Sequence, residues 1–398
     1  MALEFLLIPA AVGAVGLFGD KLSKKMSDKK KIEKIFYNIG LGVKEKGNDK
    51  PSFPKFHRKE EMENGTRYVF TLPLGTSSKL VEKIQDDRIF IDGLNKPVEV
   101  EFDGMIHIIV YDKHLPKKFP FSTEHLKENT WQVPLGLHYS GMYYHDFDKI
   151  PHMTIAGTSR YGKTVQLKNI STSLILQNPQ HAELFFIDLK GGIEFNRYRT
   201  LEQVGGVADN PYSALDLLLD IQEKMEAEQQ RFLHNYWTNV VDTEQKKRTF
   251  IIVDEAAQLA PDKSMPKKQR DILASCQLLL SEIARIGGAL GYRLIFCTQY
   301  PTADTLPRQI KMNADVKISY RLGTGYASGV AIDEYGAEKL PSGLPGRALI
   351  KTHETKEIQT PYITDKQMWK LLGRFEKVQV VDMEDDKPEN GEDTLELR

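Results

Sequence analysis

The stretch GTSRYGKT occupies residues 157–164 and fits the pattern G-x-x-x-x-G-K-[ST] at every fixed position. It follows a short apolar run at 153–156 and opens a segment with helical spacing. In that setting backbone N–H groups turn inward around phosphate oxygens, and the start of the helix adds a favourable dipole. The stretch therefore predicts a phosphate-binding loop, although a glycine-rich turn without a ligand is the alternative. The expected binding residues are Gly157, Thr158, Ser159, Arg160, Tyr161, Gly162, Lys163 and Thr164.

Two side chains of this loop have individual roles in the prediction. Lys163 is expected to reach the β- and γ-phosphate oxygens as a point charge. The Thr164 hydroxyl is expected to bind Mg²⁺. The implied ligands are a nucleoside triphosphate, ATP above all, and Mg²⁺.

A second chemical signal is the run FIIVDE at 250–255, four apolar residues that end in two acids. A buried strand that stops at adjacent carboxylates is costly unless a cation or water lies there. Asp254 suits the Mg²⁺ shell, and Glu255 suits a base that orients or deprotonates an attacking water. The motif is weak alone and strong beside a phosphate-binding loop. It favours hydrolysis with water as acceptor over a small-molecule kinase.

Polar residues also end two further apolar runs. Gln299 follows the run at 294–298 and is a candidate to contact the γ-phosphate or the lytic water, with an ordinary polar loop residue as the alternative. Asp188 and Lys190 follow the run at 183–187. They are candidates to contact nucleotide or a neighbouring subunit, or to form a surface ion pair.

The spacing of apolar residues predicts an α/β fold for the second half of the chain. Strand-like runs at 152–156, 183–188, 249–254, 293–298 and 315–321 alternate with helical stretches at 163–177, 211–237 and 266–286. Such alternation is typical of a mostly parallel sheet covered by helices on both faces.

The rest of the 398 residues divides by composition. Alternating runs at 67–72, 88–92 and 107–111 predict strands, residues 80–85 a short helix, and the polar stretch 44–66 a loop. The resulting divisions are a small α+β domain at 52–120, a connector at 121–150, the ATPase at 151–365 and an acidic disordered tail at 380–398.

The N-terminus predicts a membrane anchor. Residues 5–19 are uncharged, and seven lysines follow between 21 and 34. As a helix the stretch spans about 22 Å, short of the roughly 30 Å hydrocarbon core. Positive charge after the apolar stretch places the bulk of the chain on the cytoplasmic side. We expect an anchor at 1–20, single-pass or peripheral, and a basic linker at 21–51, with a helix packed on the protein as the alternative.

Charge and cysteine content narrow the function classes. The net charge is −1, so any contact with nucleic acid must come from local basic patches. Cys276 and Cys297 lie in apolar surroundings without a CxxC pattern, which favours buried thiols over a disulfide or a zinc site.

With these residues in hand, the segment 133–352 resembles the FtsK/SpoIIIE family of DNA translocases. The stretches that carry the resemblance are IPHMTIAG at 150–157, FIDLK at 186–190, IAR at 283–285, CTQYP at 297–301, IKMNA at 310–314 and YGAEKL at 335–340. The resemblance implies a RecA-like P-loop NTPase that assembles into a homo-hexameric ring. It also implies that DNA is gripped through its backbone phosphates.

The small size, the anchor and LPGRAL at 344–349 resemble most the FtsK-type coupling proteins of Gram-positive mobile elements. This implies an ATP-driven motor that moves DNA to or through a membrane channel during conjugative transfer, with relaxase and channel proteins as further partners. One alternative is a motor for chromosome, plasmid or phage DNA. Another is a non-hydrolysing ATP-binding scaffold that recruits a DNA-processing partner. A soluble helicase fits the anchor poorly.

The sequence departs from the family where arginines are expected. Residues 287–289 are GGA where the family has Gly-Arg-Ala, and Tyr300 replaces an arginine. An arginine from a neighbouring subunit is worth about 10³–10⁵ in rate. Arg285, three residues before Gly288 and on the same helix face, is the candidate substitute, and Arg321 is a second. The alternative for both is a surface or core-edge arginine, which is favoured for Arg321.

Overall fold

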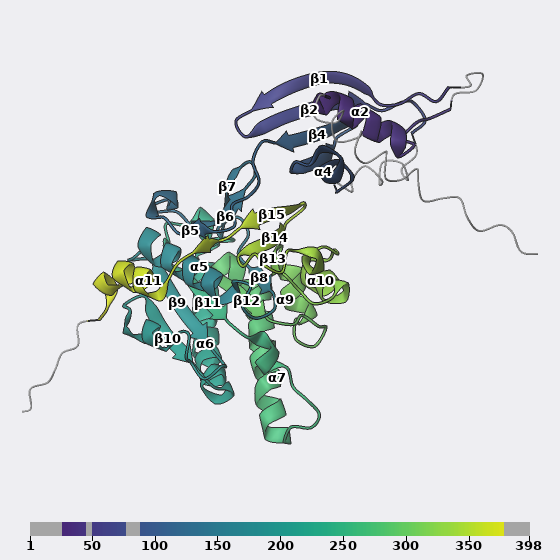
Figure 1. Cartoon of the computed structure of the whole chain (residues 1–398). Coiled ribbons are helices and arrows are strands. Elements are labelled where there is room, and N and C mark those ends of the chain that lie inside the picture. The colour runs from purple at the N-terminus through teal and green to yellow at the C-terminus, as the bar shows by residue number, and fades with distance from the viewer. Residues whose placement is uncertain (1–25, 45–49, 77–87, 378–398) are drawn as a thin grey trace, which may run out of the picture.

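The computed structural model describes residues 26–44, 50–76 and 88–377 (Figure 1). The predicted anchor at 1–20, the predicted helix at 80–85 and the predicted tail at 380–398 lie outside these residues. The described chain forms a four-stranded sheet, a ten-stranded sheet and a two-stranded ribbon.

The four-stranded sheet is antiparallel, in the order β1-β2-β4-β3. Two helices pack against it through aromatic and aliphatic side chains, with the Phe36 ring centroid 5.0 Å from that of Phe70 and 5.8 Å from that of Phe90. The elements are α2 (Asp28–Asn38), β1 (Lys55–Met62), β2 (Gly65–Thr71), α4 (Arg88–Leu94), β3 (Val98–Phe102) and β4 (Met105–Tyr111).

The structure differs from three expectations for this region. The predicted strand at 88–92 is helix α4, because Phe90 and Leu94 lie four residues apart and pack on the sheet together. The predicted loop at 44–66 contains strand β1, an edge strand whose charged residues pair along each face, Arg58 with Glu60 and Lys59 with Glu61. The predicted linker at 21–51 contains α2, whose Ile32 and Phe36 are fully buried in the core of this small domain.

The ten-stranded sheet has the order β10-β9-β11-β12-β8-β13-β14-β15-β6-β7. The first six strands are parallel and the last four antiparallel. In chain order the strands are β6 (Gln132–His138), β7 (Gly141–Asp146), β8 (Met153–Ala156), β9 (Ala182–Ile187), β10 (Val204–Ala208), β11 (Arg248–Val253), β12 (Tyr292–Thr298), β13 (Val316–Tyr320), β14 (Arg347–Lys351) and β15 (Thr355–Gln359). The five predicted strands are confirmed. The predicted connector at 121–150 is wrong in that it supplies β6 and β7 to this sheet.

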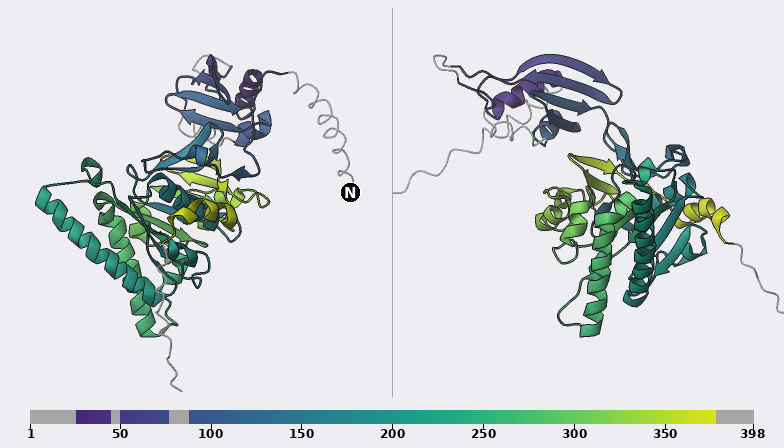
Figure 2. Two further views of the ribbon diagram at one scale, coloured as in Figure 1. Left: turned by 90° about the vertical axis from the view of Figure 1, so that its left-hand side faces the viewer. Right: turned by 180° about the vertical axis from the view of Figure 1, so that it is seen from behind.

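Helices cover both faces of the sheet, as the alternation predicts. On one face α5 (Lys163–Gln177) and α11 (Asp365–Leu372) pack through Leu167, Leu174 and Met368. On the other face lie α6 (Pro211–Asn235), α7 (Lys267–Glu282) and α9 (Arg308–Asn313). Figure 2 shows that α6 and α7 project beyond the sheet at the end away from the small domain.

The segment Lys267–Leu290 is the one described helix long and apolar enough to cross a membrane. It comprises α7, a π-helical turn (Ile283–Gly287) and α8 (Gly288–Leu290). Leu273, Cys276 and Leu280 on this segment are buried in the core against the sheet. We therefore assign it as a core helix.

Candidate nucleotide site

The predicted phosphate-binding loop joins the end of β8 to the start of α5. Gly162 has φ +114°, and a Cβ there would lie 3.2 Å from the Tyr320 ring and 3.3 Å from Gly346. A Cβ on Gly157 would lie 2.6 Å from Tyr320 Cβ. Neither position has room for a side chain, so both glycines are required for the loop to approach β13.

Backbone contacts anchor the loop at two points. The Thr158 N–H donates to the Arg321 carbonyl at 3.1 Å, and the Gly346 N–H donates to the Tyr161 carbonyl at 2.9 Å. The loop is thereby fixed to the end of β13 and the start of β14. The backbone N–H groups of the loop residues nearest α5 are then left to bind a ligand.

The structure brings Lys163 and Glu255 together at the carboxyl ends of the parallel strands. Their Nζ and Oε2 atoms are 3.4 Å apart, and each side chain is 5% exposed. β11, which precedes Glu255, is separated from β8 by β12 alone. Residues 92 apart in sequence therefore share one buried ion pair beneath the loop.

Hydrogen bonds fix the orientation of the Glu255 carboxylate. Its Oε1 accepts from the Gln299 N–H at 3.1 Å and from the Thr298 hydroxyl at 3.4 Å. The Gln299 side-chain oxygen in turn accepts from the Ser159 hydroxyl of the loop at 2.8 Å. Gln299 thus lies between the base candidate and the phosphate-binding loop, within reach of a terminal phosphate or its water.

The residues at the predicted metal position fit a divalent cation. Asp254 is 1% exposed, and its Oδ1 has no hydrogen-bond partner among the described residues. A buried carboxylate oxygen without a partner is costly, and a hard cation would satisfy it. Thr164 lines the adjoining cavity.

A cavity of about 670 Å³ extends from the loop. Its far wall comes from the ribbon of β5 (Phe119–Pro120) and β16 (Pro361–Tyr362), where the Lys118 ammonium lies 4.2 Å from the Tyr362 ring centroid. Sequence reasoning missed this wall. No local motif marks it, because Lys118 and Tyr362 meet only through pairing of distant segments.

The model of the FtsK/SpoIIIE family matches residues 122–259, which include the phosphate-binding loop and both acids. The chain carries an FtsK/SpoIIIE domain. The resemblance stated from the sequence is confirmed, and the matched region begins in β5–β6 and ends just after Glu255.

Curated relatives of the FtsK/SpoIIIE domain are longer proteins. The DNA translocase FtsK of Campylobacter jejuni is 31% identical over 206 residues, which are 49% of this chain and 21% of that protein. The DNA translocase FtsK of Streptococcus agalactiae is 28% identical over 381 residues, 89% of this chain and 44% of that protein. The chain thus spans less than half the length of either.

Solved structures share the fold of the FtsK/SpoIIIE domain. The pCW3 conjugation coupling protein TcpA, in a monomer form with ATPγS, aligns with a TM-score of 0.62 and 23% identity over 87% of this chain and 99% of that one. ATPases 2 and 3 of EssC from Geobacillus thermodenitrificans align with a TM-score of 0.56 and 18% identity, over 66% and 51% respectively. The likeness confirms a P-loop ATPase fold with a mixed sheet.

Neither candidate arginine enters the nucleotide cavity of its own chain. Arg285 precedes β12, at the edge of the sheet opposite the phosphate-binding loop, and pairs with Glu282 on the surface. The Arg321 guanidinium donates to the Leu340 carbonyl and is held at the core edge. A role for Arg285 in hydrolysis therefore requires the nucleotide of a neighbouring subunit.

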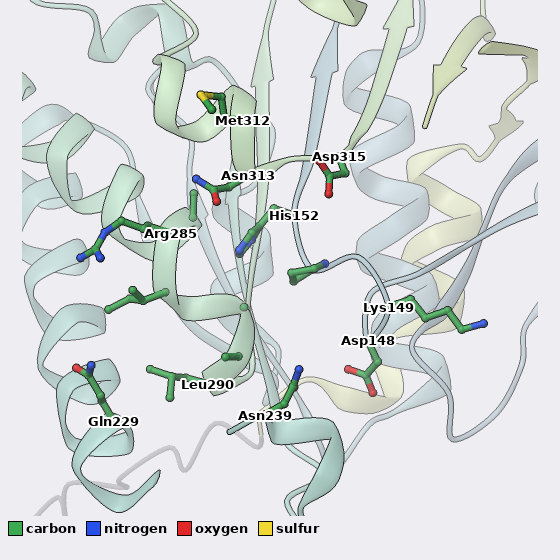
Figure 3. Close-up of a pocket in the computed structure, with 15 residues that line it drawn as sticks. Asp148, Lys149, His152, Gln229, Asn239, Arg285, Leu290, Met312, Asn313 and Asp315 are labelled. Atoms are coloured by element: carbon green, nitrogen blue, oxygen red, sulfur yellow. The ribbon is translucent and has the colours of Figure 1, made fainter. Parts of the chain in front are cut away.

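A second pocket of about 590 Å³ lies at this opposite edge of the FtsK/SpoIIIE domain (Figure 3). Arg285, Asn313 and the buried His152 line it. The His152 Nδ1 accepts from the Leu294 N–H at 3.0 Å. Burial lowers the pKa of His152 to about 3, so the ring is neutral and serves β12 as an acceptor.

The buried, neutral ring of His145 should make the fold sensitive to acid. It is buried against Phe147, and burial lowers its pKa to about 3. The unfolded chain takes up this proton below about pH 6.5, so the contribution of the neutral ring to stability is present above that pH and is lost as the pH falls toward 3. We expect His145→Phe to reduce the loss in unfolding free energy between pH 7 and pH 5 by about 2 kcal/mol. Urea unfolding of both proteins at the two pH values measures this, and equal losses would contradict it.

Proposed function

We propose that the chain hydrolyses ATP and uses the free energy to move DNA, as a coupling protein that delivers DNA to or through a membrane channel in conjugative transfer. One observation carries the proposal. Lys163 at the start of α5 meets Glu255 and Gln299, which follow the ends of β11 and β12, beneath the phosphate-binding loop of an FtsK/SpoIIIE domain.

Each residue of the site has a separate role in the proposed hydrolysis. The loop N–H groups and Lys163 hold the phosphates, so Lys163 exchanges Glu255 for a phosphate oxygen. Glu255 stays oriented by the Gln299 N–H and takes the proton of the attacking water. Gln299 contacts the terminal phosphate or this water. Asp254 and Thr164 would hold Mg²⁺, which supplies charge neutralisation at the phosphates.

The position of Arg285 supports a ring of subunits. It lies at the edge of the sheet opposite the nucleotide cavity of its own chain. In a head-to-tail ring, one subunit presents this edge to the nucleotide of the next. We propose that Arg285 completes a neighbour's site in such a ring, and that the ring is the homo-hexamer that the family resemblance implies.

Membrane attachment belongs to the same proposal. Residues 5–19 are uncharged and are followed by lysines up to residue 34, and α2 carries part of this lysine run on the surface of the small domain. We infer that the N-terminus holds the ATPase at the cytoplasmic side of the cell membrane, where it meets a relaxase and channel proteins.

DNA-stimulated ATPase activity of the full chain tests the proposal. Phosphate contacts release counterions, so we expect stimulation at low salt that falls more than about tenfold between 50 and 200 mM salt. The Glu255→Gln protein, purified in parallel, measures contaminating activity. Nucleotide binding without hydrolysis at any DNA concentration would favour the ATP-binding scaffold instead.

Tyr362 predicts where the base of the nucleotide lies. The ring is 41% exposed in the cavity wall facing the phosphate-binding loop. Base–aromatic stacking is worth about 1–3 kcal/mol, so Tyr362→Ala should weaken ATP binding about 5–150-fold. Calorimetric titration measures the affinity. Tyr37→Ala, which removes an exposed tyrosine from the small domain, is the control and should bind normally; an equal affinity for all three proteins would refute this base position.

A further inference from the structure

Lys190 is a cation that the proposed hydrolysis does not use, and it contacts both acids of the site. Its Nζ lies 3.0 Å from Asp254 Oδ2 and 3.5 Å from Glu255 Oε2. The sequence left Lys190 open as a contact to nucleotide or to a neighbouring subunit, or as part of a surface ion pair, and the structure places its ammonium against both acids of the site.

The ammonium lies at the place where a divalent cation fits. Asp254 gives one oxygen to Lys190 and retains the other without a described partner. A lysine and a divalent cation compete for the same buried carboxylate, because two cations this close repel each other strongly.

The segment that carries Lys190 has two fixed ends and an exposed tip. At one end Asp188 accepts from the Lys190 N–H at 3.2 Å and from the Glu194 N–H at 3.1 Å. At the other end the Phe195 ring stacks on Phe186 with centroids 4.8 Å apart. Between them Ile193 is 86% exposed.

Two glycines allow the chain to turn sharply at this tip. Gly191 and Gly192 have φ +81° and +71°, a region that other residues rarely adopt. The Gly192 N–H donates to the Asp188 carbonyl at 3.1 Å, and the Gly192 carbonyl accepts from the Asn196 N–H at 2.9 Å. The contacts of the Lys190 side chain with the two acids are thus one of several interactions that hold this turn.

We propose that Lys190 takes the place of the divalent cation before nucleotide binds and leaves Asp254 when Mg-nucleotide enters, so that residues 190–193 signal occupation of the site at the protein surface. The inference rests on the proposed function, since it requires nucleotide in this cavity. It makes Lys190 a positioning residue that acts through Asp254.

The first test is the magnesium dependence of nucleotide binding to the full chain. ATPγS affinity is measured across a range of Mg²⁺ concentrations for the wild type, Lys190→Met and Lys366→Met. The last removes an exposed lysine on α11 and is the matched control. Mg²⁺ should increase the affinity for ATPγS. We expect the Mg²⁺ concentration that gives half of this increase to be about tenfold lower in Lys190→Met, because the competing Lys190 ammonium is absent. An unchanged Mg²⁺ requirement, or an equal weakening of binding with and without Mg²⁺ as for a phosphate ligand, would overturn the proposal.

The second test reads the loop itself. Ile193→Cys introduces a thiol at the exposed tip, whereas the native Cys276 and Cys297 are fully buried. Its rate of alkylation should change severalfold on addition of ATPγS with Mg²⁺, and not with ATPγS and EDTA. Adding Lys190→Met should give the Mg-bound rate before nucleotide is present. One rate under all conditions would overturn the proposal.

Different outcomes would contradict the proposed function and the inference about Lys190. Failure of wild-type protein to bind ATPγS would remove the proposed function and this inference together. If wild-type protein binds ATPγS normally but Lys190→Met changes neither the magnesium dependence of binding nor the alkylation rate, the inference about Lys190 is wrong and the proposed function stands.

Discussion

Glu255→Gln is expected to lower ATP turnover about 10²–10⁴-fold, the usual contribution of a positioned general base. The amide retains an oxygen that accepts from the Gln299 N–H, so the side chain should stay in place. Nucleotide affinity should therefore change little. Phosphate release at saturating ATP measures the turnover, and calorimetric titration with ATPγS measures the affinity.

The control for this prediction is a matched amide exchange outside the site. Glu338 lies near the end of β13, where its carboxylate accepts from the Gly336 N–H. Glu338→Gln therefore replaces an acid that does not contact Lys163. It should hydrolyse ATP at the wild-type rate. Wild-type turnover in the Glu255→Gln protein would remove Glu255 as the base.

Lys163→Ala is expected to weaken ATP binding about 100-fold, because it removes the charged donor to the phosphates from a nearly dry site. Lys163 is also a buried partner of Glu255. Its loss leaves Lys190 as the remaining cation within 4 Å of that carboxylate among the described residues. Calorimetric titration with ATP in the presence of Mg²⁺ gives the affinity.

Folding must be monitored in the same protein. Removing one partner of a buried ion pair destabilises the fold, so thermal unfolding of Lys163→Ala should show a lower midpoint. Lys163→Met, which keeps the apolar stem, separates the two effects. It should fold more stably than the alanine variant yet bind ATP equally poorly, and normal binding by either variant would contradict the assignment of Lys163.

The placement of the site residues could be predicted because the motifs that carry them are local in sequence. The phosphate-binding loop and the pair Asp254-Glu255 are continuous in sequence, and parallel strands buried on both faces appear as apolar runs. Since parallel strands share one edge for their carboxyl ends, the convergence of Lys163 with Glu255 follows from the order of the motifs.

What escaped prediction depends on pairing between distant segments. β6 contains Pro134 and a bulge, and β14 and β15 form an antiparallel hairpin without a distinctive turn motif. The cavity wall at Tyr362 exists only because β16 pairs with β5. Helix α4 was mistaken for a strand because a short apolar run has no clear period.

The partner of Lys190 also could not be foreseen. Its position after β9 placed it at the correct edge of the sheet, and β9 lies beside β11. The choice between a surface ion pair and the acids of the site depends on the turn at Gly191 and Gly192, which sets the direction of the side chain. Sequence spacing does not report that direction.

The proposed function requires a triphosphate held between Lys163 and Glu255. A structure of the full chain with ATPγS and Mg²⁺ tests this requirement most directly. We predict phosphates on the loop N–H groups of residues 157–164, the terminal phosphate beside Lys163 and Glu255, and Lys190 withdrawn from Asp254. Nucleotide bound at the opposite edge of the sheet, or a Lys163–Glu255 ion pair unchanged beneath an empty loop at saturating nucleotide, would contradict it.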